Sequence, residues 1–109
     1  MSDPPPAAGD CGAELSAPPG ALVRLLNICN QKGLHARASA KFVQTVEKFD
    51  AEVRVSRCGE TVGGTSIMGL MMLAAGPGTS ITVTATGKES AEVLAALEAL
   101  VNSRFGEDD

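Results

Sequence analysis

The chain has 109 residues, 44% of them hydrophobic, and a formal net charge of −4. This length has room for one domain, and with three Phe, no Trp and no Tyr its core must be built mainly from aliphatic side chains and Met. No apolar run is long enough for a membrane helix, no basic run with interleaved aromatics points to nucleic acid, and the N-terminus lacks a secretory signal pattern, so we expect a cytoplasmic protein without membrane insertion.

The two ends of the chain differ in composition from the rest. Residues 1–20 are rich in Pro, Ala, Gly and Asp, which predicts a disordered N-terminal extension. Residues 106–109 (GEDD) predict an acidic C-terminal tail. The expected folded domain, residues 21–105, holds nine basic and seven acidic residues, so its own net charge is +2.

Alternating apolar residues predict strands in this domain, and apolar spacings of three and four predict helices. The first strand should point Leu26 and Ile28 inward, and Thr65 or Ser66 can cap the second helix. In chain order we predict a strand at 22–29, a helix at 36–49, strands at 51–56 and 60–63, a helix from the cap to Leu73, a strand at 80–86 and a helix at 90–103.

The strands alternate strictly enough to indicate a sheet with one face on the core and one in water. In the last strand Ile81, Val83 and Ala85 alternate with Thr82, Thr84 and Thr86. The fold class is therefore α+β. We predict an open-faced β-sandwich of order β-α-β-β-α-β-α, with a four-stranded antiparallel sheet and three helices on one face.

The three cysteines Cys11, Cys29 and Cys58 are widely spaced and contain no CxxC pair. This pattern predicts free thiols and no metal site. We expect no cofactor.

His35 is the only histidine and directly precedes the first predicted helix, which places it at the helix N-cap. The backbone amides that follow, at Ala36, Ala38 and Ser39, could bind an anion there, and Arg37 could add its guanidinium. A neutral imidazole is a suitable nucleophile for a phosphoryl group. Two alternatives stay open: a module that binds an anion without a covalent bond, and a hydrolase with His35 as general base. The second is the weaker, because no further acid, nucleophile or metal cluster forms a recognisable motif.

The segment Gly33–Arg37 (GLHAR) resembles the active-site signature of HPr, the phosphocarrier family of the bacterial phosphoenolpyruvate-dependent phosphotransferase system. A second family motif, Ser66–Met71 (SIMGLM), follows at the expected distance, and the resemblance spans residues 21–105. It implies that His35 is phosphorylated on Nδ1, that Arg37 helps to hold the phosphate, and that Ser66 is the target of a regulatory HPr kinase/phosphorylase.

The resemblance also implies a function and partners. The protein would be a carrier rather than an enzyme. It would act as a monomer that receives phosphate from Enzyme I and passes it to EIIA-type proteins of a sugar-uptake or nitrogen-related system. Two residues depart from the common family pattern: Ala38 replaces a Pro, and Lys32 stands where many relatives have Asn.

The second predicted helix is too apolar for one buried face. We expect Leu70 and Leu73 to enter the core and Ile67, Met68 and Met71 to remain partly exposed. At the matching positions HPr proteins contact their partners, so the resemblance implies a docking surface there.

Overall fold

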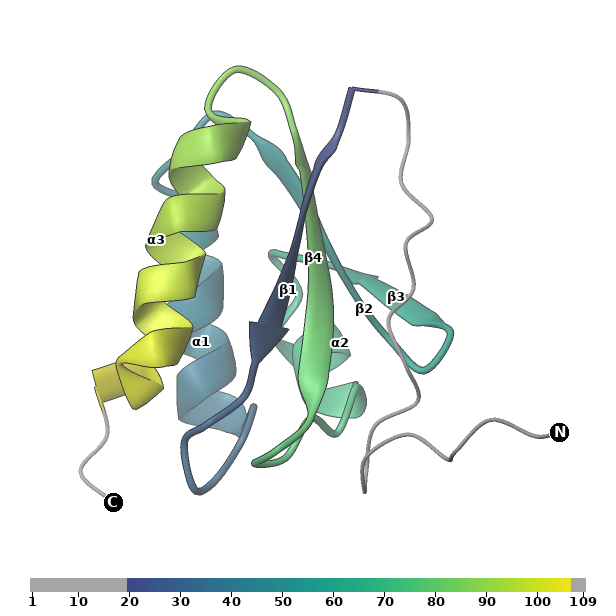
Figure 1. Ribbon diagram of the computed structural model, residues 1–109, viewed down its shortest axis with the longest axis vertical. Helices are drawn as coiled ribbons and strands as arrows, with labels where there is room; N and C mark the ends of the chain where they lie inside the picture. The colour runs from purple at the N-terminus through teal and green to yellow at the C-terminus, as the bar shows by residue number, and fades with distance from the viewer. Residues whose placement is uncertain (1–19, 107–109) are drawn as a thin grey trace, which may run out of the picture.

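The computed structural model describes residues 20–106, which form one four-stranded antiparallel sheet with three helices (Figure 1). Residues 1–19 of the predicted disordered extension and residues 107–109 of the predicted acidic tail therefore lie outside the described residues. The fold class and the element order β-α-β-β-α-β-α are as predicted. The elements are β1 (Leu22–Asn27), α1 (Ala36–Val46), β2 (Glu52–Arg57), β3 (Glu60–Gly63), α2 (Ile67–Met72), β4 (Ser80–Thr86) and α3 (Ser90–Asn102), followed by a 3-10 turn (Arg104–Gly106).

The sheet order is β1-β4-β2-β3, so the last strand in the sequence lies in the middle of the sheet. β4 pairs with β1, aligning Leu26 with Ile81, and on its other side with β2, aligning Val55 with Val83. Figure 1 shows α1 and α3 side by side against this sheet, with α2 near its lower end. Because the loop from β1 to α1 also lies at that end, the start of α1 and the α2 region are neighbours.

The helices bury the apolar faces that the sequence predicted. On α1 the buried residues include Ala38, Phe42 and Val46, and β1 contributes the buried Leu26, with Ile28 just beyond it. On α3 the fully buried residues are Val93, Leu94, Leu97 and Val101. These side chains pack with the inward residues of β2 and β4 into one core.

Two predicted elements end early. β1 stops at Asn27, and the amide of Ile28 then donates to the carbonyl of Thr79 in the facing loop. α1 stops at Val46 rather than Phe49, because the amide of Phe49 donates to the carbonyl of Val46 in a tighter turn. Phe49 nevertheless packs against the core, which is why its apolar spacing resembled a continued helix.

The outer face of the sheet is less exposed than predicted. Thr82 and Thr84 are only 2% and 8% exposed, although they lie opposite the inward residues of β4. The reason is the central place of β4, since Thr82 has Leu25 of β1 on one side and Ser56 of β2 on the other. An alternating pattern predicts which face of the sheet a residue lies on, but it does not predict how far the residue lies from the edge of the sheet.

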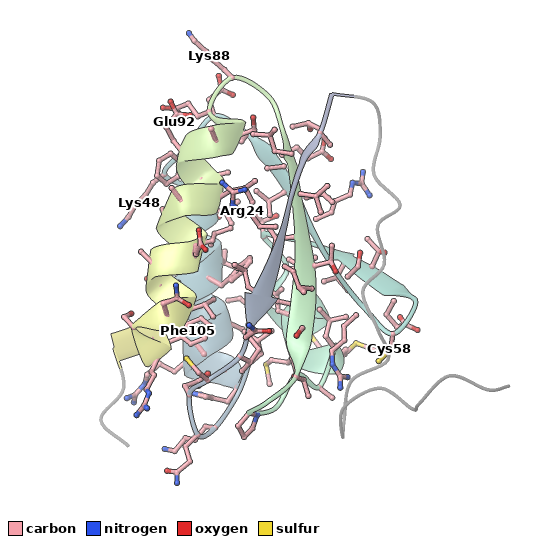
Figure 2. All side chains as sticks on the ribbon, in the orientation of Figure 1. Arg24, Lys48, Cys58, Lys88, Glu92 and Phe105 are labelled. Carbon is pink, nitrogen blue, oxygen red and sulfur yellow. The ribbon has the colours of Figure 1, made fainter. Side chains whose placement is uncertain are left out.

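The sequence did not predict the turn that ends the folded region. Arg104 and Phe105 both have left-handed backbones (φ 59° and 55°), and the turn drives the Phe105 ring into the core, where it is fully buried. The Nζ of Lys41 on α1 donates to the Phe105 carbonyl at 2.6 Å, which fixes the turn beside α1 (Figure 2).

The cysteine prediction holds for Cys29, an exposed free thiol. It is wrong for Cys58, which is disulfide-bonded. Cys11 lies outside the described residues. Within residues 20–106 there is no cluster of potential metal ligands. No helix in the same range is long and apolar enough to cross a bilayer.

Candidate functional site

His35 stands at the N-cap of α1, as the sequence predicted. Its backbone is extended (φ −76°, ψ −176°), and its carbonyl accepts the amide of Ser39 at 2.8 Å, which is the first helical hydrogen bond. The amide of His35 donates to the Gly33 carbonyl at 2.9 Å. The imidazole therefore leaves the chain from a fixed point at the start of the helix, and it is partly exposed.

The Nδ1 atom of His35 faces the helix and accepts a hydrogen bond from the amide of Arg37 at 3.2 Å. An accepting Nδ1 carries a lone pair, so the neutral ring holds its proton on Nε2. The N-terminus of a helix carries about half a unit of positive charge, and the first turn of α1 contains no acidic residue. The site thus combines a nitrogen lone pair with an electropositive helix end.

The structure restricts which of the predicted amides can reach an anion. Ala36 and Arg37 are exposed, whereas Ala38 and Ser39 are fully buried. The amide of Ser39 is committed to the His35 carbonyl, and its hydroxyl donates to the Leu34 carbonyl at 3.2 Å. The Ser39 amide is therefore occupied within the helix, and Ala36 and Arg37 are the exposed residues of this turn, while phosphate binding by the amides of Ala38 and Ser39 stays a prediction.

Two shallow cavities flank the His35 ring. One, of about 300 Å³, is lined by Lys32, His35, Ala36 and Arg37. The other, of about 220 Å³, lies toward the loop after α2 and is lined by Lys32, Leu34, His35, Ala74, Ala75 and Gly76. Of residues 20–106, those in the two linings include Lys32 and Arg37 and no carboxylate. The surroundings of the ring therefore favour an anion.

Ser66 is the N-cap of α2. Its hydroxyl oxygen accepts the amide of Gly69 at 3.0 Å, and the residue is exposed. The capping role considered for this position is thus present.

The apolar residues of α2 divide as the sequence predicted. Leu70 and Leu73 are buried, while Ile67, Met68 and Met71 are 39%, 74% and 42% exposed. The structure adds a residue that sequence reasoning did not place on this surface. Met72 is 77% exposed, because it follows the buried Leu70 by two residues and so points to the opposite side of the helix. We call Ile67, Met68, Met71 and Met72 the α2 patch.

Arg57, at the end of β2, holds the end of α2 in place. Its Nη1 donates to the carbonyl of Leu73 at 3.0 Å, which satisfies one of the last carbonyls of the helix. Neither this contact nor the position of Lys32 beside the ring was predicted. The sequence held one signal for Lys32, its difference from the common family pattern, and none for Arg57.

Comparison with known proteins agrees with this geometry. The family model described as the PTS HPr component phosphorylation site matches residues 23–103. The chain is 49% identical over 88 residues to a phosphocarrier protein HPr of Neisseria meningitidis, covering 81% of this chain and 99% of that protein. It is 38% identical over 86 residues to a phosphocarrier protein NPr of Shewanella violacea, covering 79% of this chain and 94% of that protein.

A solved structure gives the same result for the fold. The crystal structure of HPr-C-His from Thermoanaerobacter tengcongensis superposes with a TM-score of 0.77 at 38% identity, covering 81% of this chain and 99% of that one. The fold and the relatives together identify the chain as a small α+β phosphocarrier of the phosphotransferase system. The chain belongs to the HPr family. Members of this family carry phosphoryl groups between proteins and are not catalytic enzymes.

Proposed function

We propose that this protein accepts a phosphoryl group on the Nδ1 of His35 from Enzyme I, which draws it from phosphoenolpyruvate, and donates it to EIIA-type proteins of a sugar-uptake or nitrogen-related phosphotransferase system. It works as a cytoplasmic monomer with a covalent phosphohistidine intermediate. The observation that carries the proposal is the 3.2 Å hydrogen bond from the Arg37 amide to Nδ1, because it aims the lone pair at the helix end that would stabilise the transferred group.

The chemistry needs no further reactant. The Nδ1 lone pair attacks phosphorus, and the bond from phosphorus to the donor atom of Enzyme I breaks, its electron pair leaving with the donor. The ring keeps its proton on Nε2 during this step and for as long as it carries the phosphoryl group. The reverse displacement, with an acceptor nucleophile in place of the donor, returns the ring to its starting state.

The amide of Arg37 has a part in each state of the ring. Before transfer it donates to Nδ1. Once Nδ1 is bonded to phosphorus, that lone pair is lost, and the amide can donate to a phosphoryl oxygen instead. The exposed amide of Ala36 and the guanidinium of Arg37 are the other groups available for the negative oxygens.

The α2 patch is proposed as the surface on which Enzyme I and EIIA-type proteins dock. Four exposed apolar side chains on one short helix form a deformable surface suited to more than one partner. The loop that follows the patch lines a cavity with His35, so a partner seated on α2 lies next to the reacting ring.

Ser66 is proposed as a site of regulation by an HPr kinase/phosphorylase. A phosphate there adds about two negative charges beside the α2 patch. Because Ser66 is exposed and lies at the start of α2, the added charge should hinder docking without unfolding the domain.

The decisive experiment is incubation with Enzyme I and labelled phosphoenolpyruvate. The proposal requires a protein-bound phosphoryl group that is labile in acid, stable in base and absent from His35→Ala. The label should then move to an added EIIA-type protein.

The alternative function is that of a module that binds an anion without a covalent bond, and the basic side chains of Lys32 and Arg37 in the cavity linings support it. It predicts saturable binding of inorganic phosphate and no covalent label. A stable label on His35 would exclude it.

A further inference from the structure

Among the residues that the structure describes, Lys32 is the only one besides His35 that lines both cavities beside the ring. Arg37 borders one of them, on the side of α1, whereas Lys32 also reaches the side that faces the loop after α2. A phosphoryl group projecting from Nδ1 must occupy space next to one or both cavities. Lys32 therefore borders that space whichever way the group is turned.

The backbone that carries Lys32 is held in place. The amide of Gly33 donates to the Asn30 carbonyl at 3.2 Å, and the Nδ2 of Asn30 donates to the Gly33 carbonyl at 2.8 Å. The Gly33 backbone also lies directly against the carbonyl of Ala75. The Lys32 side chain, in contrast, is exposed and can reorient quickly. A cation that stabilises a phosphoryl group which is bound and then passed on needs a backbone held in place and a side chain that can move.

We infer that Lys32 is a second cation for the phosphoryl group on His35, its ammonium contacting the phosphoryl oxygens on the side opposite Arg37. The inference rests on the proposed phosphohistidine. The group carries up to two negative charges, and among the described residues that line these cavities the basic side chains are those of Lys32 and Arg37. An exposed ion pair is worth up to about a fivefold change in an equilibrium constant.

Lys32 could instead pair with an acidic surface on Enzyme I, and one measurement separates the two roles. The equilibrium constant for exchange of phosphate between Enzyme I and this protein depends only on the free proteins before and after transfer. Contacts made in the complex change the rate in both directions and cancel from that constant. A contact with the carried phosphate does not cancel.

The experiment measures this constant at low ionic strength for the full chain and three variants. Lys32→Gln removes the charge at similar length, and Lys32→Arg keeps it. Lys48→Gln is the matched control, since Lys48 is exposed and lies beyond the far end of α1 (Figure 2). We expect Lys32→Gln to shift the equilibrium about fivefold toward phosphorylated Enzyme I, with the shift lost at high salt. Lys32→Arg and Lys48→Gln should stay within about twofold of the parent protein.

An unchanged constant for Lys32→Gln overturns the inference, and a slower rate at an unchanged constant assigns Lys32 to docking. In both cases the parent protein is still labelled, so the proposed function stands. If the parent protein itself takes no label, the proposed function fails and the inference fails with it.

Discussion

The amide of Leu34 donates a 2.9 Å hydrogen bond to the carbonyl of Ala75, which joins the loop before His35 to the loop after α2. Gly33 lies against the same carbonyl with φ +64°, and a Cβ there would come within 2.3 Å of the Ala75 oxygen. The reacting ring and the α2 patch are thus held by one set of contacts, and a change at that junction should affect both.

Gly33→Ala tests the junction. The left-handed backbone costs a non-glycine residue about 1–2 kcal/mol, and the clash with Ala75 adds to this. We expect a loss of about 2–4 kcal/mol in the free energy of unfolding, measured with urea. Gly78→Ala is the matched control, because Gly78 also has a positive φ (+87°) but nothing within 4 Å of its Cβ position. Equal losses in the two variants would contradict the close approach.

Ala74→Gly should stabilise the protein. Ala74 follows the end of α2 with φ 54°, a left-handed position that glycine occupies at little cost. After the entropy that glycine loses on folding, we expect a net gain of about 0.5–1 kcal/mol in urea unfolding. The neighbouring Ala75→Gly lacks the positive φ and removes a buried methyl group, so it should destabilise. If the urea concentration at the unfolding midpoint of Ala74→Gly is equal to or lower than that of the parent protein, the expected stabilisation is refuted.

Arg37→Ala should keep the fold and slow transfer. Arg37 is exposed, so the change in stability should stay within about 0.5 kcal/mol. Loss of charge-assisted hydrogen bonds to the phosphoryl oxygens should lower the rate of phosphate acceptance about tenfold or more. Arg54→Ala on β2, whose guanidinium pairs with Glu52 at 3.2 Å, provides the control for loss of an exposed arginine. Equal rates for the two variants would remove Arg37 from the site.

Ser66→Asp should slow acceptance without loss of stability. Asp caps a helix about as well as Ser, so we expect unfolding free energies within about 0.5 kcal/mol of each other. The negative charge beside the α2 patch should reduce the initial rate of phosphate transfer from Enzyme I about tenfold. Ser66→Asn keeps the cap without the charge and should transfer at the parent rate. If Ser66→Asp also transfers at that rate, charge at this position does not regulate docking.

Met72→Ser tests whether the docking surface extends to the end of α2. The side chain is 77% exposed, so stability should change little. If Enzyme I covers it, kcat/KM for transfer should fall about tenfold, the order expected for a methionine that is buried on binding. Leu25→Ser, at an exposed apolar position on β1, should leave kcat/KM unchanged. A Met72→Ser protein as active as the parent would confine the patch to the earlier residues of α2.

Local sequence pattern was sufficient for much of the site. His35 could be placed at a helix start because the apolar spacing of α1 begins immediately after it, and the exposure of Met68 followed from an excess of apolar residues over one helical face. These are properties of neighbours in the chain, which the periods of helix and strand relate directly to position. Element types were predictable for the same reason.

Thr82 and Phe105 show where this reasoning stops. Thr82 was expected in water, but β4 became a central strand, and Phe105 entered the core through two left-handed residues. Periodicity orients a side chain on its own element, and it was enough to define the helices, the strands and the histidine at the start of α1. The central place of β4, the turn that buries Phe105 and the junction at Ala75 depend on segments far apart in the chain, so only packing in three dimensions could decide them.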